Sequence, residues 1–179
     1  MARLVALLRG INVGGRNLVP MAELKAMAAA LGWDEPQTYI QSGNLVFKAA
    51  GSAAALERAL EAALEQKPGI RTDVLVRTKA QWNAIVAANP FRADAEKDPN
   101  LVLCGIPKKG LAGGAAEALA ARAAAGERVR EAGGVLWFHY PEGAGRSKLT
   151  PALIDRSAGS PVTARNWRTM LKLGEMLAP

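Results

Sequence analysis

The sequence predicts an α+β protein in which an N-terminal ferredoxin-like half packs with a second, smaller α+β half of similar order. Two observations lead to this prediction. Within residues 1–78, strand-like and helix-like segments follow the order β-α-β-β-α-β, which is typical of the ferredoxin-like fold. The remaining residues repeat most of that order. We therefore expect a ferredoxin-like α+β subdomain at residues 1–78 and a second α+β subdomain, ending in two helices, at residues 79–179.

Hydrophobic spacing and turn-forming residues define the elements of the N-terminal half. A continuous apolar run of strand length begins the chain, and Pro20 and Gly32 suit the start and the end of a helix. β-rich segments flank Ser42-Gly43, which predicts a hairpin. The expected elements are strand 2–8, helix 20–32, strands 37–41 and 44–49, a helix opened by Gly51-Ser52 and closed by Pro68-Gly69, and strand 72–78.

The second half follows a similar plan. Thr78 and Gln81 have the spacing of a capping box and predict the start of a helix. The expected elements are helix 79–89, strand 101–106, helix 112–125, strands 127–132 and 135–140 around Gly133-Gly134, and helices 148–157 and 164–177. Without its first helix this order is β-α-β-β-α with an extra helix. We infer a degenerate second copy from the order alone, because the residues themselves show no repeat.

Both faces of the first strand are apolar. Leu4, Ala6 and Leu8 point to one face, and Val5 and Leu7 point to the other. Helices cover only one face of the sheet in a lone ferredoxin-like domain, so the second half or a partner subunit is expected to cover the other. A monomer and a homodimer both fit this expectation.

The chain is basic, with a net charge of +7 and an isoelectric point of about 9.9. This charge favours a phosphate-bearing small molecule or a nucleic acid as partner. The basic residues are dispersed, however, and a bias toward Ala, Gly and Arg in the coding DNA would produce the same charge. No apolar run approaches the ~20 residues that span a bilayer, so no membrane partner is expected. The single cysteine, Cys104, forms no internal disulfide, which favours a cytoplasmic location.

Three stretches together carry a family resemblance: LLRGINVGGRNLVPMAEL, TYIQSGNLVF and TARNWRTMLKL. The motifs NPF at 89–91 and GRSKL at 145–149 fit the same pattern. In this order they resemble the bacterial family catalogued as Domain of Unknown Function 1697, over essentially the whole chain. The resemblance implies two α+β subdomains, the first of them ferredoxin-like. It implies no activity and no catalytic residue.

The stretch LRGINVGG, which follows the first strand, has glycines at positions 10, 14 and 15. Their spacing matches neither the dinucleotide-binding nor the P-loop motif. Glycines allow left-handed backbone, in which successive N–H groups form an anion-binding nest. The alternative is a turn whose asparagines satisfy their own backbone. The candidate ligand-binding residues of this loop are Arg9, Asn12, Arg16 and Asn17.

The hairpin offers Gln41, Ser42 and Asn44 as further candidates, although short polar residues are also what a tight turn requires. On the assumption that the second strand runs antiparallel to the first, the hairpin is expected at the opposite end of the sheet from the LRGINVGG loop. Arg77, which ends the fourth strand, is then expected at the hairpin's end and is a candidate there.

The C-terminal candidates are Arg146, Ser147, Lys148, Arg165 and Asn166. Thr163 is the expected N-cap of the last helix, which places Arg165 and Asn166 in or near its first turn. Helix N-termini and guanidinium groups both favour phosphate or carboxylate. The alternative is that Arg165 pairs with a carboxylate such as Asp155 or Glu175 and stabilises the last helix.

Residues for conventional catalysis are few. His139 is the only histidine and lies in a strand, and Cys104 lies in an apolar strand where it is expected to be inert. No spacing indicates a metal site, and no cofactor is expected. Phe47 is the only aromatic residue in the two strands on which RNA-binding ferredoxin-like domains stack bases, which argues against that class.

These observations favour binding of a phosphate-bearing ligand or a nucleic-acid backbone through Arg, Asn and Ser loops and helix N-termini. One alternative is an enzyme that acts on a small anionic substrate by electrostatic stabilisation. The other is a structural or interaction protein without a ligand, in which Arg165 is buried and paired with an Asp or Glu.

Overall fold

The computed structural model describes residues 1–67 and 69–178, so Pro68, an expected helix-closing residue, lies outside the described residues. The chain divides into two compact units. The first unit comprises Met1–Trp82 and Leu173–Pro179, and the second comprises Asn83–Lys172. Each unit contains a four-stranded sheet whose neighbouring strands are antiparallel.

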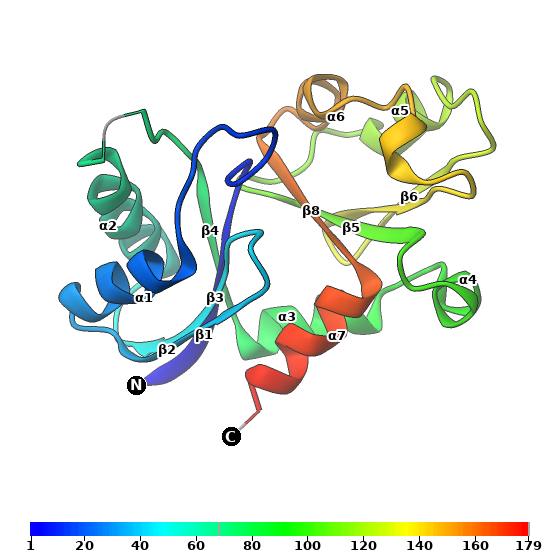
Figure 1. The fold of residues 1–179 in the computed structure, drawn as a ribbon. Helices are drawn as coiled ribbons and strands as arrows, with labels where there is room; N and C mark the ends of the chain where they lie inside the picture. Colours follow the sequence, from blue (N-terminus) through cyan, green and yellow to red (C-terminus); the bar gives the residue numbers. More distant parts are fainter. Residues whose placement is uncertain (68, 179) are drawn as a thin grey trace. The chain divides into compact units, whose positions relative to one another are not determined.

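The first unit has the ferredoxin-like arrangement that the sequence predicted. Its sheet has the order β2-β3-β1-β4, and both helices lie on one face of it (Figure 1). Apolar side chains of these helices and of one sheet face form its core, which includes Leu24, Leu60 and Phe47. The elements are β1 (Ala2–Leu8), α1 (Met21–Ala30), β2 (Asp34–Tyr39), β3 (Asn44–Ala49), α2 (Ala53–Glu65) and β4 (Val74–Thr78).

The outer edge of β4 is closed by helix α2. Glu61 accepts a hydrogen bond from the backbone N–H of Val74, and Glu57 accepts one from Val76, both at 2.8 Å. These glutamates are one helical turn apart, so they reach alternate N–H groups of the strand. The contacts protect the edge from pairing with another chain.

The second unit contains a complete β-α-β-β-α-β order. Its sheet has the order β6-β7-β5-β8, which matches the first sheet strand for strand. The elements are α3 (Lys79–Ala87), α4 (Arg92–Lys97), β5 (Val102–Pro107), α5 (Ala115–Ala120), β6 (Arg128–Ala132), β7 (Val135–His139), a 3-10 helix (Ala144–Arg146), α6 (Pro151–Ala158), β8 (Val162–Asn166) and α7 (Trp167–Met176). By residue assignment, α3 begins in the first unit and α7 ends there.

The expected helix 164–177 is wrong at its start, because residues 164–166 belong to strand β8. Residues Val162–Asn166 pair with β5, and helix α7 begins only at Trp167. The N-cap is Asn166, whose Oδ1 accepts the N–H of Thr169 at 2.9 Å, and not Thr163. The segment TARN has the residues of a helix start, but its pairing partner lies some 60 residues earlier and leaves no local signal.

Equivalent residues recur in the two halves at the junction of last strand and following helix. Arg77 and Arg165 occupy the same position in the pairing of β4 with β1 and of β8 with β5. Each donates from Nη1 to the carbonyl oxygen of the preceding residue at 2.8 Å. The next residue, Thr78 or Asn166, caps the following helix. The structure thus gives residue-level support for the internal repeat that the order of elements suggested.

Candidate functional site

The β1–α1 loop (residues 9–20) and the β2–β3 hairpin (residues 40–43) lie together at one end of the first sheet. The backbone N–H of Leu8 donates to the carbonyl oxygen of Gly43 at 2.9 Å. The expectation that they lie at opposite ends is wrong. Both β1 and β2 are antiparallel to β3, so they run parallel to each other, and their C-terminal ends lie at the same end of the sheet.

Asn12 connects this loop to the hairpin. Its Nδ2 donates to the carbonyl oxygens of Gln41 at 2.7 Å and Val19 at 2.9 Å, and its Oδ1 accepts the N–H of Val19 at 2.8 Å. The backbone of Asn12 is left-handed, with φ +55°, a conformation that asparagine tolerates better than most residues. Both donors of the side chain are therefore used to hold the loop.

Two other amide side chains of the region also stabilise the local turns. Asn17 donates to the carbonyl oxygen of Gly10 at 3.2 Å. Asn44 is fully buried and donates to the carbonyl oxygen of Tyr39 at 3.0 Å and to Oγ of Ser42 at 2.9 Å. These contacts are those of turn-forming residues.

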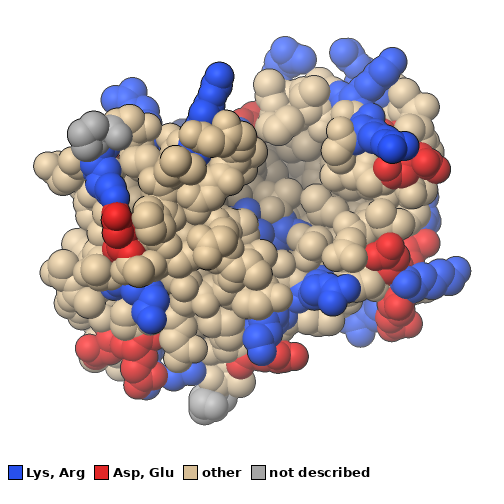
Figure 2. All heavy atoms as spheres, viewed as in Figure 1, with Lys and Arg blue, Asp and Glu red and all other residues tan. Residues whose placement is uncertain are grey.

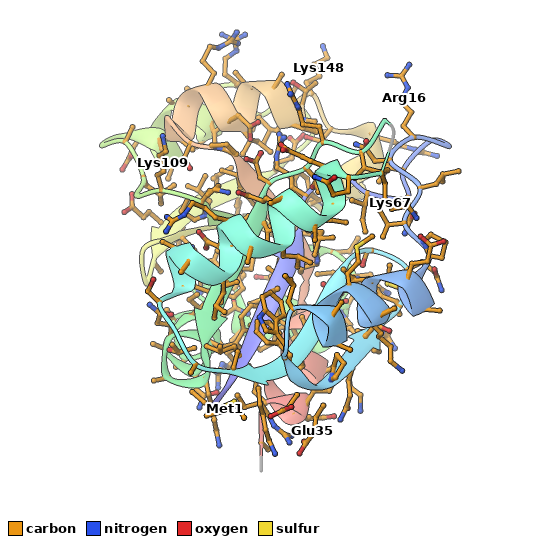
Figure 3. All side chains as sticks on the ribbon, turned by 90° about the vertical axis from the view of Figure 1, so that its left-hand side faces the viewer. Met1, Arg16, Glu35, Lys67, Lys109 and Lys148 are labelled. Atoms are coloured by element: carbon orange, nitrogen blue, oxygen red, sulfur yellow. The ribbon has the colours of Figure 1, made fainter. Side chains whose placement is uncertain are left out.

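The groups of these two loops that face solvent include Gln41, several apolar side chains and the loop tip, which we define as Gly14–Arg16. A turn closed by the N–H of Arg16 on the carbonyl oxygen of Val13, at 3.0 Å, forms the tip. Gly14 and Gly15 are both left-handed, with φ of 57° and 72°. Arg16 projects from this end of the unit (Figure 3). Val13, Leu18 and Ile40 are more than half exposed.

Two further arginines were expected near these loops. Arg9 is half-buried at the end of β1, where its N–H donates to the carbonyl oxygen of Asp73 at 3.0 Å. Arg77 is opposite Val5 in the sheet, away from the hairpin, so its expected place at the hairpin's end is wrong. Burial lowers the pKa of Arg77, and Glu57, whose Oε1 lies 3.7 Å from Nη1, opposes that shift.

The C-terminal candidates are distributed over different elements of the second unit. Arg165 is only 9% exposed and donates to Oγ1 of Thr163 at 3.0 Å, and burial lowers its pKa to about 10. In the register of β8 with β5, Arg165 is opposite Cys104, and its side chain lies on one face of the sheet. Leu149 belongs to the core that α5 and α6 form on the other face. Arg146 and Lys148 are exposed.

Ser147 is committed to a local hydrogen-bond network. Its hydroxyl donates to Oε1 of Glu127 at 2.6 Å and accepts the N–H of Leu149 at 3.1 Å. The hydroxyl, together with the backbone N–H groups of Ala125 and Ala124, lowers the pKa of Glu127 to about 2. Ser147 therefore positions a loop through a buried carboxylate.

The family model described as Protein of unknown function (DUF1697) matches residues 1–137. The chain belongs to this family. The matched range contains the β1–α1 loop and the hairpin and ends before Arg146. Among solved structures, the conserved bacterial protein SP0830 from Streptococcus pneumoniae is 28% identical, with a TM-score of 0.76 and 99% of each chain covered. No curated protein matches significantly.

One polar cluster of this DUF1697 chain was missed by sequence reasoning. Arg128 donates from Nη2 to Oδ2 of Asp94 at 2.7 Å and to Nδ1 of His139 at 3.1 Å. Its guanidinium lies 4.9 Å from the ring centroid of Phe91. Burial is the main cause of the lowered pKa of His139. The charge of Arg128 lowers this pKa further, whereas the charge of Asp94 raises it. The cluster joins α4 to β6 and β7, and the weak helical pattern of RADAEK gave no signal for it.

Few side chains in the described residues of this DUF1697 protein are suited to act as a nucleophile or to bind a metal. Cys104 is fully buried, and burial raises the pKa of its thiol well above the usual value. No group of three or more His, Cys, Asp or Glu side chains that could hold a metal ion occurs within residues 1–67 and 69–178. None of the helices in those ranges is long and apolar enough to cross a membrane.

Proposed function

We propose that this protein binds a phosphate-bearing ligand or a nucleic-acid backbone at the loop tip. The observation that carries the proposal is the sequence of two left-handed glycines directly before an exposed arginine. Among the described residues, the N–H groups of Gly14 and Gly15 donate to no acceptor. Successive free N–H groups beside a guanidinium are a typical arrangement for phosphate recognition.

The surroundings of the tip support an anionic ligand. The loop RGINVGGRNLVP contains two arginines and no carboxylate. Because Asn12 holds the loop to the hairpin, the tip is ordered before any ligand arrives, which reduces the entropic cost of binding. On the face shown in Figure 2, lysines and arginines are scattered among carboxylates, so the charge of that face alone does not provide this selectivity.

The test is a titration of the protein with inorganic pyrophosphate and with a short DNA duplex, comparing Arg16→Gln and Arg58→Gln. Both substitutions remove one exposed charge from the first unit, but Arg58 lies on α2. We expect Arg16→Gln to weaken binding about tenfold and Arg58→Gln to leave it unchanged, because guanidinium–phosphate contacts act at short range.

The salt dependence distinguishes the two ligand classes. A nucleic-acid backbone contacted by several cations gives a steep linear decrease of log affinity with log salt concentration, whereas a single bound phosphate gives a shallow one. Equal effects of Arg16→Gln and Arg58→Gln, or no binding of either probe, would overturn the proposal.

A further inference from the structure

A second cationic site lies at the other end of the first unit. A pocket of about 330 Å³ is lined by Met1, Arg3, Lys48, Lys79 and Leu177. Three of these five residues are cations and none is acidic. Figure 3 shows Met1 at the end of the first unit opposite Arg16, so this pocket is separate from the loop tip.

The sheet register brings two of the cations together. Arg3 of β1 is directly opposite Lys48 of β3, so the two side chains share one sheet face. Like charges in directly opposed positions destabilise a sheet unless an anion lies between them. A negative charge at the pocket would therefore reduce the repulsion between Arg3 and Lys48.

Glu35 already supplies part of that charge. Its carboxylate accepts from Nη2 of Arg3 at 2.7 Å and from Nζ of Lys48 at 2.5 Å. Glu35 has a left-handed backbone, with φ +49°, within a bulge of β2, and its side chain is half exposed. The hydrogen bond from Lys48 is the main cause of its lowered pKa. An irregular backbone thus directs one carboxylate of the chain onto this cation pair.

The remaining cationic capacity is on Arg3 and Lys79. Arg3 is fixed, because Nη1 also donates to the carbonyl oxygens of Ala178 at 2.9 Å and Met176 at 3.3 Å. Lys79 is exposed at the first position of α3, and no carboxylate pairs with it within the part of the chain that the structure describes. Asp34 of β2 is directly opposite Lys48 and adds a second carboxylate to this sheet face. Three cationic side chains therefore lie with two carboxylates, which leaves an excess of one positive side-chain charge.

Two other pockets of the first unit have a different charge. Their volumes are about 260 and 380 Å³, and both are lined by carboxylates beside the cations. The lining residues are Glu61, Glu65, Arg71, Thr72 and Asp73 in the former, and Glu65, Lys67, Gly69, Ile70 and Arg71 in the latter. Of these three pockets, the pocket at Arg3 is lined by cations and apolar side chains without an acidic residue.

We infer that this pocket binds a small organic dianion with a short apolar part. The anionic group is held by Lys79 and Lys48 beside the fixed guanidinium of Arg3, and the apolar part contacts Met1 and Leu177. A volume of 330 Å³ is at the small end of ligand sites, which suits a small molecule and not a polymer. Phosphate monoesters and dicarboxylates share this chemistry.

The experiment is a calorimetric titration at low salt with phenyl phosphate and, in a second arm, with glutarate. Lys79→Gln is expected to weaken binding about tenfold, since it removes one of the cations that contact the anion. Lys25→Gln, which removes an exposed charge from α1 of the same unit, is the matched control and is expected to leave affinity unchanged. The arm with the higher affinity identifies the anionic group.

Glu35→Gln gives the sharper result. It removes the competing carboxylate and frees Lys48, so affinity for the dianion is expected to rise several-fold, whereas a purely structural glutamate would change only the melting temperature. Arg16→Gln is expected to have no effect, which separates this site from the loop tip. No saturable binding by the wild-type protein, equal losses in Lys79→Gln and Lys25→Gln, or unchanged affinity in a folded Glu35→Gln would overturn the inference.

Discussion

Replacing Asn12 by alanine removes the side chain that connects the β1–α1 loop to the β2–β3 hairpin. The substitution deletes three hydrogen bonds, two to Val19 and one to Gln41. It also places alanine at a left-handed backbone position, φ +55°, where a Cβ without a polar group is unfavourable. The loop then loses its contact with the hairpin while its exposed tip keeps its sequence.

The magnitude follows from these contacts. Each hydrogen bond contributes about 1 kcal/mol net, and the left-handed alanine costs a further 1–2 kcal/mol or so. Water replaces part of the contact to Gln41, which lies at the surface. We therefore expect Asn12→Ala to lower the free energy of unfolding by about 3 kcal/mol. Asn12→Gly relieves the backbone and is expected to lose about 1 kcal/mol less.

The assay is urea unfolding together with amide hydrogen exchange. Trp33 is buried and stacked on Phe47 at a ring-centroid distance of 4.1 Å, but it is one of four tryptophans, so fluorescence reports on unfolding of both units. The N–H of Val19 donates to Oδ1 of Asn12, so its exchange should accelerate in both variants. The local readout matters because two units need not unfold in a single transition.

A small effect would refute this reasoning. The side chain does not hold the loop if the free energy of unfolding of Asn12→Ala is within about 0.5 kcal/mol of the wild-type value and the N–H of Val19 keeps its protection from hydrogen exchange. A larger loss in Asn12→Gly than in Asn12→Ala would show that backbone strain at this position has the opposite sign to the one argued.

Two further predictions concern packing and pH. Gly43→Ala is expected to destabilise by about 2–4 kcal/mol in urea unfolding, because its Cβ would lie 2.8 Å from side-chain atoms of Leu8 and Ile11 at a left-handed φ of +78°. Gly134, at the equivalent position of the other hairpin, has φ +73° and open space, so Gly134→Ala should lose only about 1 kcal/mol; equal losses would contradict the packing argument. Glu127 has its pKa lowered to about 2 from near 4.5, so its stabilising effect is fully present above pH 4.5 and disappears as pH falls through 2. The melting temperature of Glu127→Gln should lie below that of the wild-type protein at pH 7 and approach it in acid, and a gap independent of pH would argue against this.

Local sequence patterns predicted most elements because their signals are contained within a few residues. The apolar run 2–8 is β1 without change, and Ser42-Gly43 and Gly133-Gly134 mark the two hairpins. Errors occurred where local and long-range preferences conflict. The expected helix 112–125 is only Ala115–Ala120, and β8 replaced the start of a helix because it pairs with β5.

The sequence pointed to the two loops of the first unit but not to their arrangement. The sequence singled out Asn12, Arg16 and Ser42 from composition and spacing alone. The sequence-based prediction placed the loop and the hairpin at opposite ends of the sheet. Strands β1 and β2 are parallel because both are antiparallel to β3, which lies between them, and neither β1 nor β2 contains a local signal of this arrangement. No local pattern indicated the pocket at Arg3, whose cations come from β1, β3 and α3.

The sequence by itself determined the α+β class, the ferredoxin-like first half and the glycine-rich tip, since periodicity and turn residues act over distances of a few residues. The tertiary structure alone decided which side chains bond to the protein's own backbone and which stay exposed to solvent. Asn12 and Arg165 are indistinguishable from ligand-binding residues in the sequence, yet both donate to the protein's own oxygens. Hydrogen bonds between segments distant in the chain make that distinction, and they exist only once the strands have paired.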